Sequence, residues 1–229
     1  MRNEDWEPIY SEILSDMGYD RASDENSAKV LRTLMLNADL IMDDELESVI
    51  GSTVSVFGAA DSLSSDIAKM KPEGTLISAG SATSAVMSMG IIPDIVVTDL
   101  DGDIVSQIEA SRKGAITLIH AHGDNVDLVM RYAKEFTGKV ILTTQSKPDY
   151  VLFNFGGFTD GDRAVCLARH FGARKIILYG FDFENPSSKD GSDPEIKKKK
   201  LAWAKRIIGD SEDIVRLLWR IAPESVRTA

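Results

Sequence analysis

The sequence has a single cysteine, Cys166, and no apolar run longer than a β-strand. A lone cysteine excludes a disulfide within the chain and is typical of a reducing compartment, so we expect a cytoplasmic protein with Cys166 packed in its core. The missing long run excludes a transmembrane helix, which needs about 20 apolar residues. The opening residues MRNEDWEPIY also lack the apolar segment of a signal peptide, so we expect neither secretion nor membrane association.

Positive charge is scarce as well. The 229 residues include 26 Lys and Arg against 36 Asp and Glu, which gives a formal net charge of −10. Nucleic-acid binding needs a basic face, so this balance argues against a nucleic-acid partner. The one strong basic run lies at 197–200, with Lys205 and Arg206 after it, and such runs are most often solvated helix faces. A polyphosphate substrate would therefore need a cation and local basic groups to offset the acidic surroundings.

Two glycine-rich phosphate motifs are absent. The chain contains neither GxxxxGK[ST] nor GxGxxG, which excludes a P-loop enzyme and a typical dinucleotide-binding protein. Shorter glycine turns are present, and their backbone N–H groups at helix starts are candidates for phosphate binding. The candidate residues are Gly58, Ser62, Gly80 and Ser81. Small residues also begin helices as caps, so each turn alone is weak evidence.

After residue 50 the sequence alternates between strand-like and helix-like segments. Short apolar runs predict strands at 53–57, 75–78, 95–97, 115–119, 139–142, 151–155 and 175–179. Helical patterns separate these runs, and two more helices are predicted at 195–208 and 211–221. The order is typical of an α/β, Rossmann-like, doubly wound and mostly parallel sheet with helices on both faces. We expect residues 51–229 to form this catalytic domain and residues 1–50 to be a helical extension packed on it. The extension is also a candidate surface for a homodimer.

Three carboxylates at alternate positions follow the predicted strand 95–97, in the stretch PDIVVTDLDGD. They are Asp99, Asp101 and Asp103. Right-handed crossovers place the carboxyl ends of parallel strands at one edge of the sheet, where open α/β folds bind ligands. Close carboxylates repel one another unless a cation lies between them, and oxygen ligands suit Mg²⁺, which usually accompanies a substrate phosphate. The pattern favours a Mg-nucleotide site, and the alternative is a polar surface turn.

A second polar group follows the predicted strand 115–119. It consists of His120, His122, Asp124 and Asn125. A zinc site would need a third ligand that the sequence does not show, so hydrogen bonding to a substrate is the functional interpretation. Burial as structural histidines is the alternative.

A third polar group surrounds a double glycine at the start of a predicted helix. Asn154 precedes the glycines, and Thr159, Asp160, Asp162 and Arg163 follow them. Acidic residues at a helix start are commonly caps, but the glycines favour a loop that contacts a ligand closely. A planar guanidinium also suits phosphate oxygens. Topology predicts that this group meets the other two at the carboxyl edge of the sheet.

The sequence Asp-Leu-Asp-Gly at 99–102 also resembles the nucleophile motif of haloacid-dehalogenase-type phosphatases, in which the first Asp attacks phosphate. That family carries the motif on the first strand of its domain, whereas here it follows the third predicted strand. The phosphatase therefore stands as an alternative.

Several segments together resemble archaeal-type 6-hydroxymethyl-7,8-dihydropterin pyrophosphokinases. They are LISAGSATSAVMSMG with IPDIVVTDLDGD, HAHGDN, FGGFTDGDRAVCLA, GFDF, and the N-terminal WEPIYSEILSDMGYD with DENSAKVL. The resemblance spans nearly the whole chain, and PDIVVTDLD and TDGDRAV are more distantly similar to thiamin pyrophosphokinases. One departure is Ala60-Asp61-Ser62-Leu63, where family members often have Gly-Pro-Ser-Leu, and Asp61 weakens the case for phosphate contact there.

The resemblance implies that ATP and 6-hydroxymethyl-7,8-dihydropterin give AMP and a pterin diphosphate ester, on a route to folate-type or methanopterin-type cofactors. Mg²⁺ is the implied cofactor. Asp99 and Asp101 are expected to hold it between the ATP phosphates, with Asp103 completing the site through water. Asp160 and Asp162 are expected to bind a second ion or to orient the pterin.

The remaining roles follow from hydrogen-bonding chemistry. A pterin edge has N–H donors that suit oxygen acceptors, so Asp124, Asn125 and Asn154 are candidates for it. Phosphate charge is assigned to Arg163 or Lys147, and the predicted catalytic residues are Asp101, Asp103 and Arg163. The general base is open between Asp103 and His122.

Two further classes stay open beside the diphosphotransferase. A thiamin pyrophosphokinase carries a β-domain after its catalytic domain, and the helical pattern predicted at 211–221 disfavours it. A non-catalytic nucleotide-binding module would not need so many carboxylates beside a polyphosphate.

Overall fold

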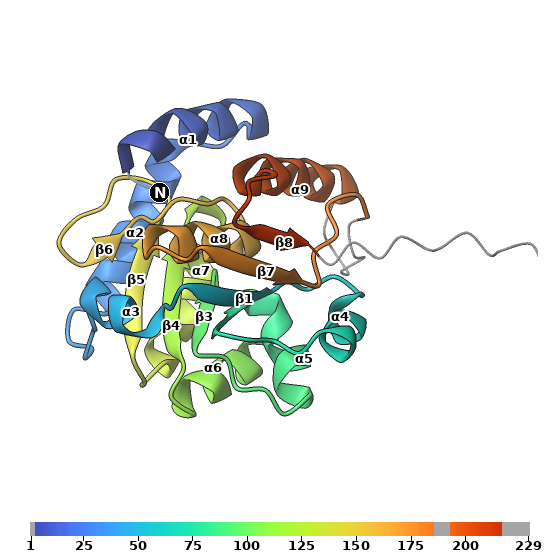
Figure 1. Ribbon diagram of the computed structural model, residues 1–229. Helices are drawn as coiled ribbons and strands as arrows, with labels where there is room; N and C mark the ends of the chain where they lie inside the picture. The colour runs from blue at the N-terminus through green and yellow to red at the C-terminus, as the bar shows by residue number, and fades with distance from the viewer. Residues whose placement is uncertain (1–2, 186–192, 217–229) are drawn as a thin grey trace, which may run out of the picture.

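The computed structural model describes residues 3–185 and 193–216. Within these ranges the chain forms one eight-stranded sheet in which every strand pairing is parallel (Figure 1). The strands are β1 (Thr53–Phe57), β2 (Thr75–Ala79), β3 (Ile95–Thr98), β4 (Ile116–Ala121), β5 (Val140–Thr144), β6 (Leu152–Phe153), β7 (Lys175–Tyr179) and β8 (Ile214–Arg216). Their spatial order is β6-β5-β4-β3-β2-β1-β7-β8, so the direction of winding reverses beside β1. Open α/β sheets bind ligands at such a switch point.

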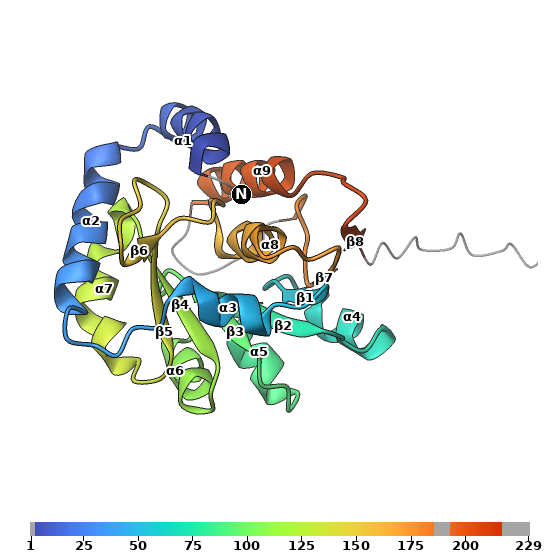
Figure 2. The ribbon, with the colours of Figure 1, turned by 60° about the vertical axis from the view of Figure 1, so that its left-hand side comes forward.

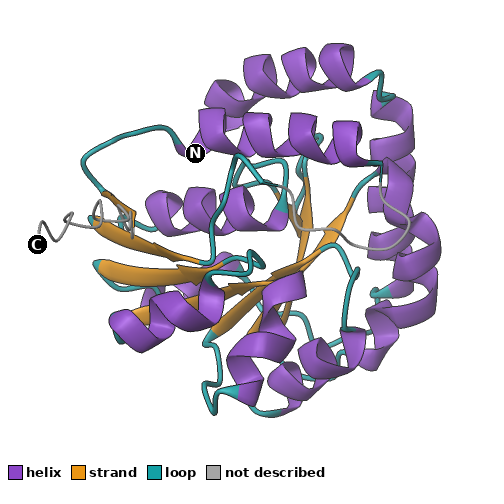
Figure 3. Ribbon diagram, turned by 90° about the vertical axis from the view of Figure 1, so that its right-hand side faces the viewer, coloured by secondary structure: helices purple, strands orange, loops and turns teal. Residues whose placement is uncertain are grey.

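Helices lie on both faces of the sheet (Figures 2 and 3). In the described part of the chain they are α1 (Asn3–Met17), α2 (Arg21–Leu34), α3 (Asp43–Val49), α4 (Leu63–Lys69), α5 (Thr83–Ser88), α6 (Ile104–Arg112), α7 (Val126–Tyr132), α8 (Asp160–His170) and α9 (Pro194–Ile208). Helices α3 and α8 cover one face, and α4, α5 and α6 cover the other. Short 3₁₀ turns, η1 (Gly80–Ala82), η2 (Gly123–Asn125) and η3 (Ala133–Glu135), complete the connections.

The strand residues divide between two cores because successive side chains point to opposite faces. Val54 and Val56 of β1 pack with α8, whereas Phe57 packs with α4 and α5. Cys166 of α8 is also buried, and burial raises the pKa of its thiol to about 12, which fits its expected place in the core. These observations confirm the predicted Rossmann-like α/β fold.

One predicted element is wrong. The helix expected at 211–221 is not formed over its described part, because residues 214–216 are strand β8, paired in parallel with β7 through Ile176↔Ile214 and Ile177↔Val215. The β-branched side chains of Ile214 and Val215 suit a strand, and an open edge of β7 is available to them. Residues 217–221 lie outside the described ranges. The strand expected at 151–155 is shorter than predicted, since only Leu152–Phe153 pair with β5.

The first 50 residues form α1, α2 and α3, as predicted. Helix α2 packs across β4, β5 and α7 with the buried faces of Ala28 and Leu31. Helix α1 packs on α9, where Trp6, Tyr10 and Trp203 share an apolar cluster. Helices α1 and α9, which are far apart in the sequence, therefore pack together on the same side of the molecule (Figures 1 and 2). The domain boundary at residue 50 stays a prediction. None of the described helices is both long enough and apolar enough to cross a bilayer.

Candidate active site

A cavity of about 600 Å³ lies at the carboxyl edge of the sheet, beside the switch point. The turns after β1, β2, β3, β4 and β7 reach it, together with the start of α8. Two further walls come from the corner between α1 and α2 and from one side of α9. The volume is within the range of small-molecule sites, roughly 300–1,000 Å³.

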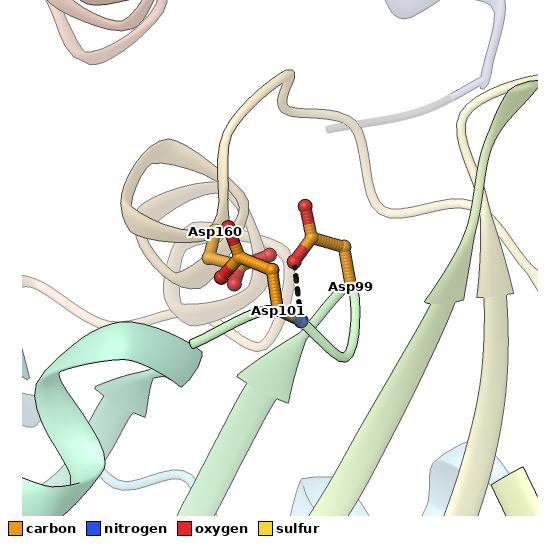
Figure 4. A group of neighbouring side chains, drawn as sticks. All are labelled: Asp99, Asp101 and Asp160. Carbon is orange, nitrogen blue, oxygen red and sulfur yellow. Dashed lines mark hydrogen bonds between the residues drawn. The ribbon is translucent and has the colours of Figure 1, made fainter. Parts of the chain in front are cut away.

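Three carboxylates meet in this cavity (Figure 4). Asp99 and Asp101 follow β3, and Asp160 opens α8; one oxygen from each lies within 4.8 Å of the other two. Asp160 therefore occupies the place that the sequence suggested for Asp103. The Asp103 carboxylate instead caps α6, because it accepts hydrogen bonds from the backbone N–H of Ser106 at 3.3 Å and from its hydroxyl at 2.7 Å.

An unusual backbone conformation aims both β3 carboxylates at the cavity. Leu100, between them, has φ +69°, a left-handed value that costs a non-glycine residue about 1 kcal/mol or more. Burial of the Leu100 side chain and a 2.8 Å bond from its N–H to Thr98 Oγ1 hold this conformation. Gln107 of α6 adds a second support, since its Nε2 donates to the carbonyl of Asp101 at 2.7 Å. Burial of Leu100 and these two hydrogen bonds together stabilise the left-handed conformation of the turn.

His122 holds Asp99 in place. The backbone N–H of Asp124 donates to His122 Nδ1 at 3.4 Å, so that nitrogen is the acceptor and Nε2 carries the proton that faces Asp99 Oδ2 at 3.3 Å. Asn125 supports both partners, because its amide donates to the Asp99 carbonyl at 2.8 Å and its Oδ1 accepts from the His122 N–H at 3.0 Å. Asn125 is buried and does not line the cavity, so its role is to position Asp99 and His122.

The carboxylates of Asp99 and Asp160 have opposite pKa shifts. Burial opposes ionisation of Asp99, but the hydrogen bond from His122 and the positive charge of Arg163 lower its pKa below the usual value. Burial, followed by the charges of Asp99 and Asp101, raises the pKa of Asp160 well above 3.8. The site therefore gathers more negative charge than its protein partners neutralise, which is the electrostatic condition for a bound cation.

Arg163 is the cation nearest this cluster. Its Nη1 lies 3.2 Å from Asp160 Oδ1, and its Nη2 donates to Gln145 Oε1 at 3.1 Å and to the Phe158 carbonyl at 2.7 Å. Its buried Nε has no hydrogen-bond partner within the described ranges. Gly157 makes this arrangement possible, because a Cβ there would lie 2.5 Å from the Arg163 Cα.

Asp162 and Thr159 form the capping box that begins α8. Asp162 is fully buried, and its carboxylate accepts hydrogen bonds from the N–H of Phe158 at 2.6 Å and from the N–H and hydroxyl of Thr159. Asp162 therefore supports the turn that carries Asp160. Thr159 lines the cavity and Asp162 does not.

Other residues singled out from the sequence are placed as follows. Of the glycine turns, Gly58 and Ser81 line the cavity, whereas Ser62 bonds to Asp66 at 2.9 Å and does not. Gly80 packs against Asp160, since a Cβ there would be 3.0 Å from its Oδ2. Thus one of the two candidate residues in each glycine turn lines the cavity.

Three further candidates lie away from it. His120 is buried with Nδ1 at 3.0 Å from Thr143 Oγ1, and burial and the charge of Arg163 keep its pKa well below 6.5. Asn154 bridges the carbonyls of Gln145 and Ser146, at 3.1 and 2.7 Å. Lys147 is exposed and is not among the lining residues. The structure thus gives His120 and Asn154 internal bonding partners.

The helical extension also reaches the cavity, which was not predicted from the sequence. The lining residues from it are Gly18, Tyr19, Asp20, Ser23 and Asp24. Asp24 shares the buried face of α2 with Ala28 and Leu31, at helical spacing, and a carboxylate on an apolar stripe is the signal that marks it. From α9, Lys197 and Lys200 also line the cavity, so part of the basic run at 197–200 does face the acidic site.

Residues 31–188 match the family described as 6-hydroxymethylpterin diphosphokinase MptE-like. Three proteins named 6-hydroxymethyl-7,8-dihydropterin pyrophosphokinase are also similar. The one from Pyrococcus furiosus is 43% identical, over 90% of this chain and 89% of its own. Those from Methanocaldococcus jannaschii and Methanothermobacter thermautotrophicus are 37% and 41% identical, over 95% and 89% of this chain and 98% and 92% of their own.

A solved structure, the Maf glycosyltransferase from Magnetospirillum magneticum AMB-1, is 16% identical with a TM-score of 0.49. The match covers 69% of this chain and 29% of that one. A likeness of this extent says nothing about activity.

Proposed function

The chain belongs to the MptE-like family of 6-hydroxymethylpterin diphosphokinases, and we propose that it transfers diphosphate from ATP to 6-hydroxymethyl-7,8-dihydropterin, with release of AMP. The observation that carries this proposal is the convergence of Asp99, Asp101 and Asp160 on one cavity. In the reaction the pterin hydroxyl oxygen bonds to the β-phosphorus of ATP, the bond from that phosphorus to AMP breaks, and the hydroxyl proton leaves. The product belongs to a route towards folate-type or methanopterin-type cofactors.

Magnesium fits the donor set of the three carboxylates. All three donors are oxygens, which Mg²⁺ prefers, and burial together with the charges of Asp99 and Asp101 raises the pKa of Asp160. We assign Asp99, Asp101 and Asp160 as the ligands. When bound, the ion neutralises phosphate charge and orients the two phosphates that separate in the reaction. Asp162 is too deeply engaged in its capping box to serve as a ligand for a second ion.

The chain itself supplies positioning and positive charge. Arg163 is held rigidly by Gln145 and the Phe158 carbonyl, so its guanidinium is preorganised for phosphate oxygens at no further ordering cost. Lys197 brings one more positive charge to the wall that α9 forms. Phosphoryl transfer depends mainly on such positioning and charge stabilisation, which agrees with this set of groups.

Neither sequence candidate for the general base is free. Asp103 uses both carboxylate oxygens to cap α6, and His122 uses both ring nitrogens within the protein. We assign His122 the role of orienting Asp99, in the manner of histidine–carboxylate pairs beside metal ligands. Phosphoryl transfer through a loose transition state depends mainly on positioning and charge stabilisation, which the carboxylate cluster and Arg163 would supply.

The direct test is an assay of AMP release from ATP, with 6-hydroxymethyl-7,8-dihydropterin or thiamin as the acceptor. We expect release with the pterin only, and its abolition when EDTA removes divalent cations. AMP release with thiamin, or equal activity in EDTA, contradicts the proposal.

A matched pair of variants tests the carboxylate assignment. Asp101→Asn should lower kcat about 100-fold, an effect of roughly 2.7 kcal/mol on the barrier, without unfolding the protein because Asp101 is exposed. Asp127→Asn, on the exposed side of α7, makes the same change of charge away from the cavity and should keep the wild-type rate. Equal rates in the two variants would remove Asp101 from the mechanism.

A further inference from the structure

One end of the cavity combines aromatic rings with charges of both signs. Tyr19, from the α1–α2 corner, and Phe158, from the loop before α8, have ring centres 6.3 Å apart. Lys200 Nζ lies 5.9 Å from the centre of each ring. Asp124 of η2 lines the same cavity.

The loop that bears Asp124 is fastened to the corner that bears Tyr19. The N–H of Gly123 donates to Asp24 Oδ1 at 2.6 Å, and a Cβ on Gly123 would lie 2.9 Å from the Ser23 Cβ. Burial, followed by the charges of Asp124 and Asp24, raises the pKa of Tyr19, which agrees with a hydroxyl close to these carboxylates. The four groups are therefore neighbours in a fixed arrangement.

Three polar groups at this end are unpaired in the part of the chain that the structure describes. Within residues 3–185 and 193–216, the Tyr19 hydroxyl, the Asp124 carboxylate and the Lys200 ammonium make no hydrogen bond or ion pair. By contrast, Asn125 and Asn154, also candidates for the pterin edge, donate their amide N–H groups to acceptors within the protein. Hydrogen-bonding capacity at a cavity wall is therefore concentrated where the aromatic rings lie.

The polar groups at this end of the cavity suit a 2-amino-4-oxo ring better than adenine. A carboxylate accepts two adjacent N–H donors, and an ammonium donates to a carbonyl oxygen. A 2-amino-4-oxo ring, as in pterins, has an amino group, a ring N–H and a carbonyl in a row. Adenine instead has one amino donor beside ring nitrogens that only accept, which a carboxylate disfavours.

We propose that Tyr19, Phe158, Asp124 and Lys200 form the subsite for the pterin ring. Tyr19 and Phe158 contact the ring, Asp124 accepts from the 2-amino and N3–H groups, and Lys200 donates to the 4-oxo group. The identity of the ring rests on the proposed function. His122 is on the same loop as Asp124 and contacts Asp99, which follows β3. A ring held at Asp124 therefore points its far side, which carries the hydroxymethyl group, towards the three carboxylates. The helical extension thereby becomes a determinant of specificity.

The test separates the Michaelis constants for the two substrates. Asp124→Asn and Tyr19→Ala should each raise KM for the pterin about tenfold or more, the effect of losing roughly 1.4 kcal/mol of binding, and leave KM for ATP within about twofold. Tyr19→Phe, which keeps the ring, should give less of the effect than Tyr19→Ala. Asp127→Asn is the charge-matched control and should change neither constant. A rise in KM for ATP with an unchanged value for the pterin overturns the assignment.

Equilibrium binding keeps this test independent of turnover. Quenching of pterin fluorescence, without ATP or Mg²⁺, should show weaker binding to Asp124→Asn than to wild type, and circular dichroism should show both folded. If the wild type binds the pterin through these residues but releases no AMP, the subsite stands and the proposed reaction fails. If the wild type turns over the pterin and Asp124→Asn and Tyr19→Ala match it, the reaction stands and the subsite fails.

Discussion

The carboxylate of Asp24 accepts a hydrogen bond from Gln145 Nε2 at 2.8 Å, across 121 residues of sequence. Gln145 in turn accepts from Arg163, which contacts Asp160. Asp24 also accepts from the hydroxyl of Tyr10 at 2.5 Å and from the N–H of Gly123. A single buried side chain of α2 therefore supports both halves of the carboxylate cluster, one through Arg163 and the other through the His122 loop.

Asp24→Asn should impair both stability and catalysis. An amide presents one acceptor oxygen and two donor hydrogens, so it cannot accept from the three donors that surround Asp24. We expect the free energy of unfolding to fall by about 1–3 kcal/mol and kcat to fall as Arg163 loses its support. Urea unfolding and initial rates at saturating substrate measure the two effects.

Tyr10→Phe is the comparison variant for Asp24. It removes one donor and leaves Gln145 and Gly123 bonded to the carboxylate, so stability should fall by about 1 kcal/mol and kcat should be kept. If Tyr10→Phe lowers kcat as far as Asp24→Asn does, then the packing of the extension, and not the Gln145–Arg163 chain, controls the rate.

Gly80→Ala should disturb the carboxylate cluster through contact alone. A Cβ at this position would lie 2.7 Å from Thr98 Oγ1 and 3.0 Å from Asp160 Oδ2; Thr98 is buried, and the Asp160 side chain is 11% exposed and paired with Arg163. We expect Asp160 to shift, the Mg²⁺ concentration for half-maximal activity to rise, and kcat to fall about tenfold, or roughly 1.4 kcal/mol.

Gly51→Ala provides the control for that substitution. Its Cβ would make only an ordinary contact, 3.8 Å from Thr75 Oγ1, on a turn that does not line the cavity. Activity and its Mg²⁺ dependence should be unchanged. A Gly80→Ala enzyme with the wild-type Mg²⁺ titration would show that Asp160 is not a ligand.

Acid should weaken the link between α8 and the segment that leads into β8. Arg169 Nε and Nη2 donate to the two oxygens of Asp213 at 2.7 and 3.1 Å, and this interaction lowers the pKa of Asp213 below 3.8, against the opposing effect of burial. A pKa lowered by folding stabilises the protein above the unfolded-state value, and that stabilisation is lost as the pH falls through the folded-state value.

Urea unfolding at two pH values measures this contribution. Asp213→Asn should lower the free energy of unfolding by about 1–3 kcal/mol at pH 7, and the difference from wild type should shrink as the pH falls below 3.8. Asp210→Asn removes a carboxylate that is 85% exposed and should change little. A difference that grows towards acid pH would contradict the sign of the shift.

The sequence predicted what depends on local pattern and topology. The β-branched run Ile95–Thr98 favours a strand, and parallel topology then brings Asp99 and Asp160 to one edge. Asp103 and Asp101 were not distinguishable, because the left-handed turn at Leu100 decides which carboxylate faces the cavity. That conformation depends on the burial of Leu100, a tertiary effect.

Contacts between residues far apart in the sequence could not be predicted from local sequence patterns. The helical pattern of α2 shows that Asp24 lies on the buried face but not that Gln145 and Gly123 bind it. The pattern after 210 also fits a helix, and only the open edge of β7 makes Ile214 and Val215 a strand. In each case the deciding partner is distant in sequence.

The cavity takes one wall from residues 18–24 and another from 193–204, and the two helices concerned touch each other through Trp6 and Trp203. During synthesis on the ribosome the sheet strands β1 to β7 emerge before the second of these walls exists. The substrate site is therefore complete only once residues 193–204 have been synthesised and α9 packs on α1.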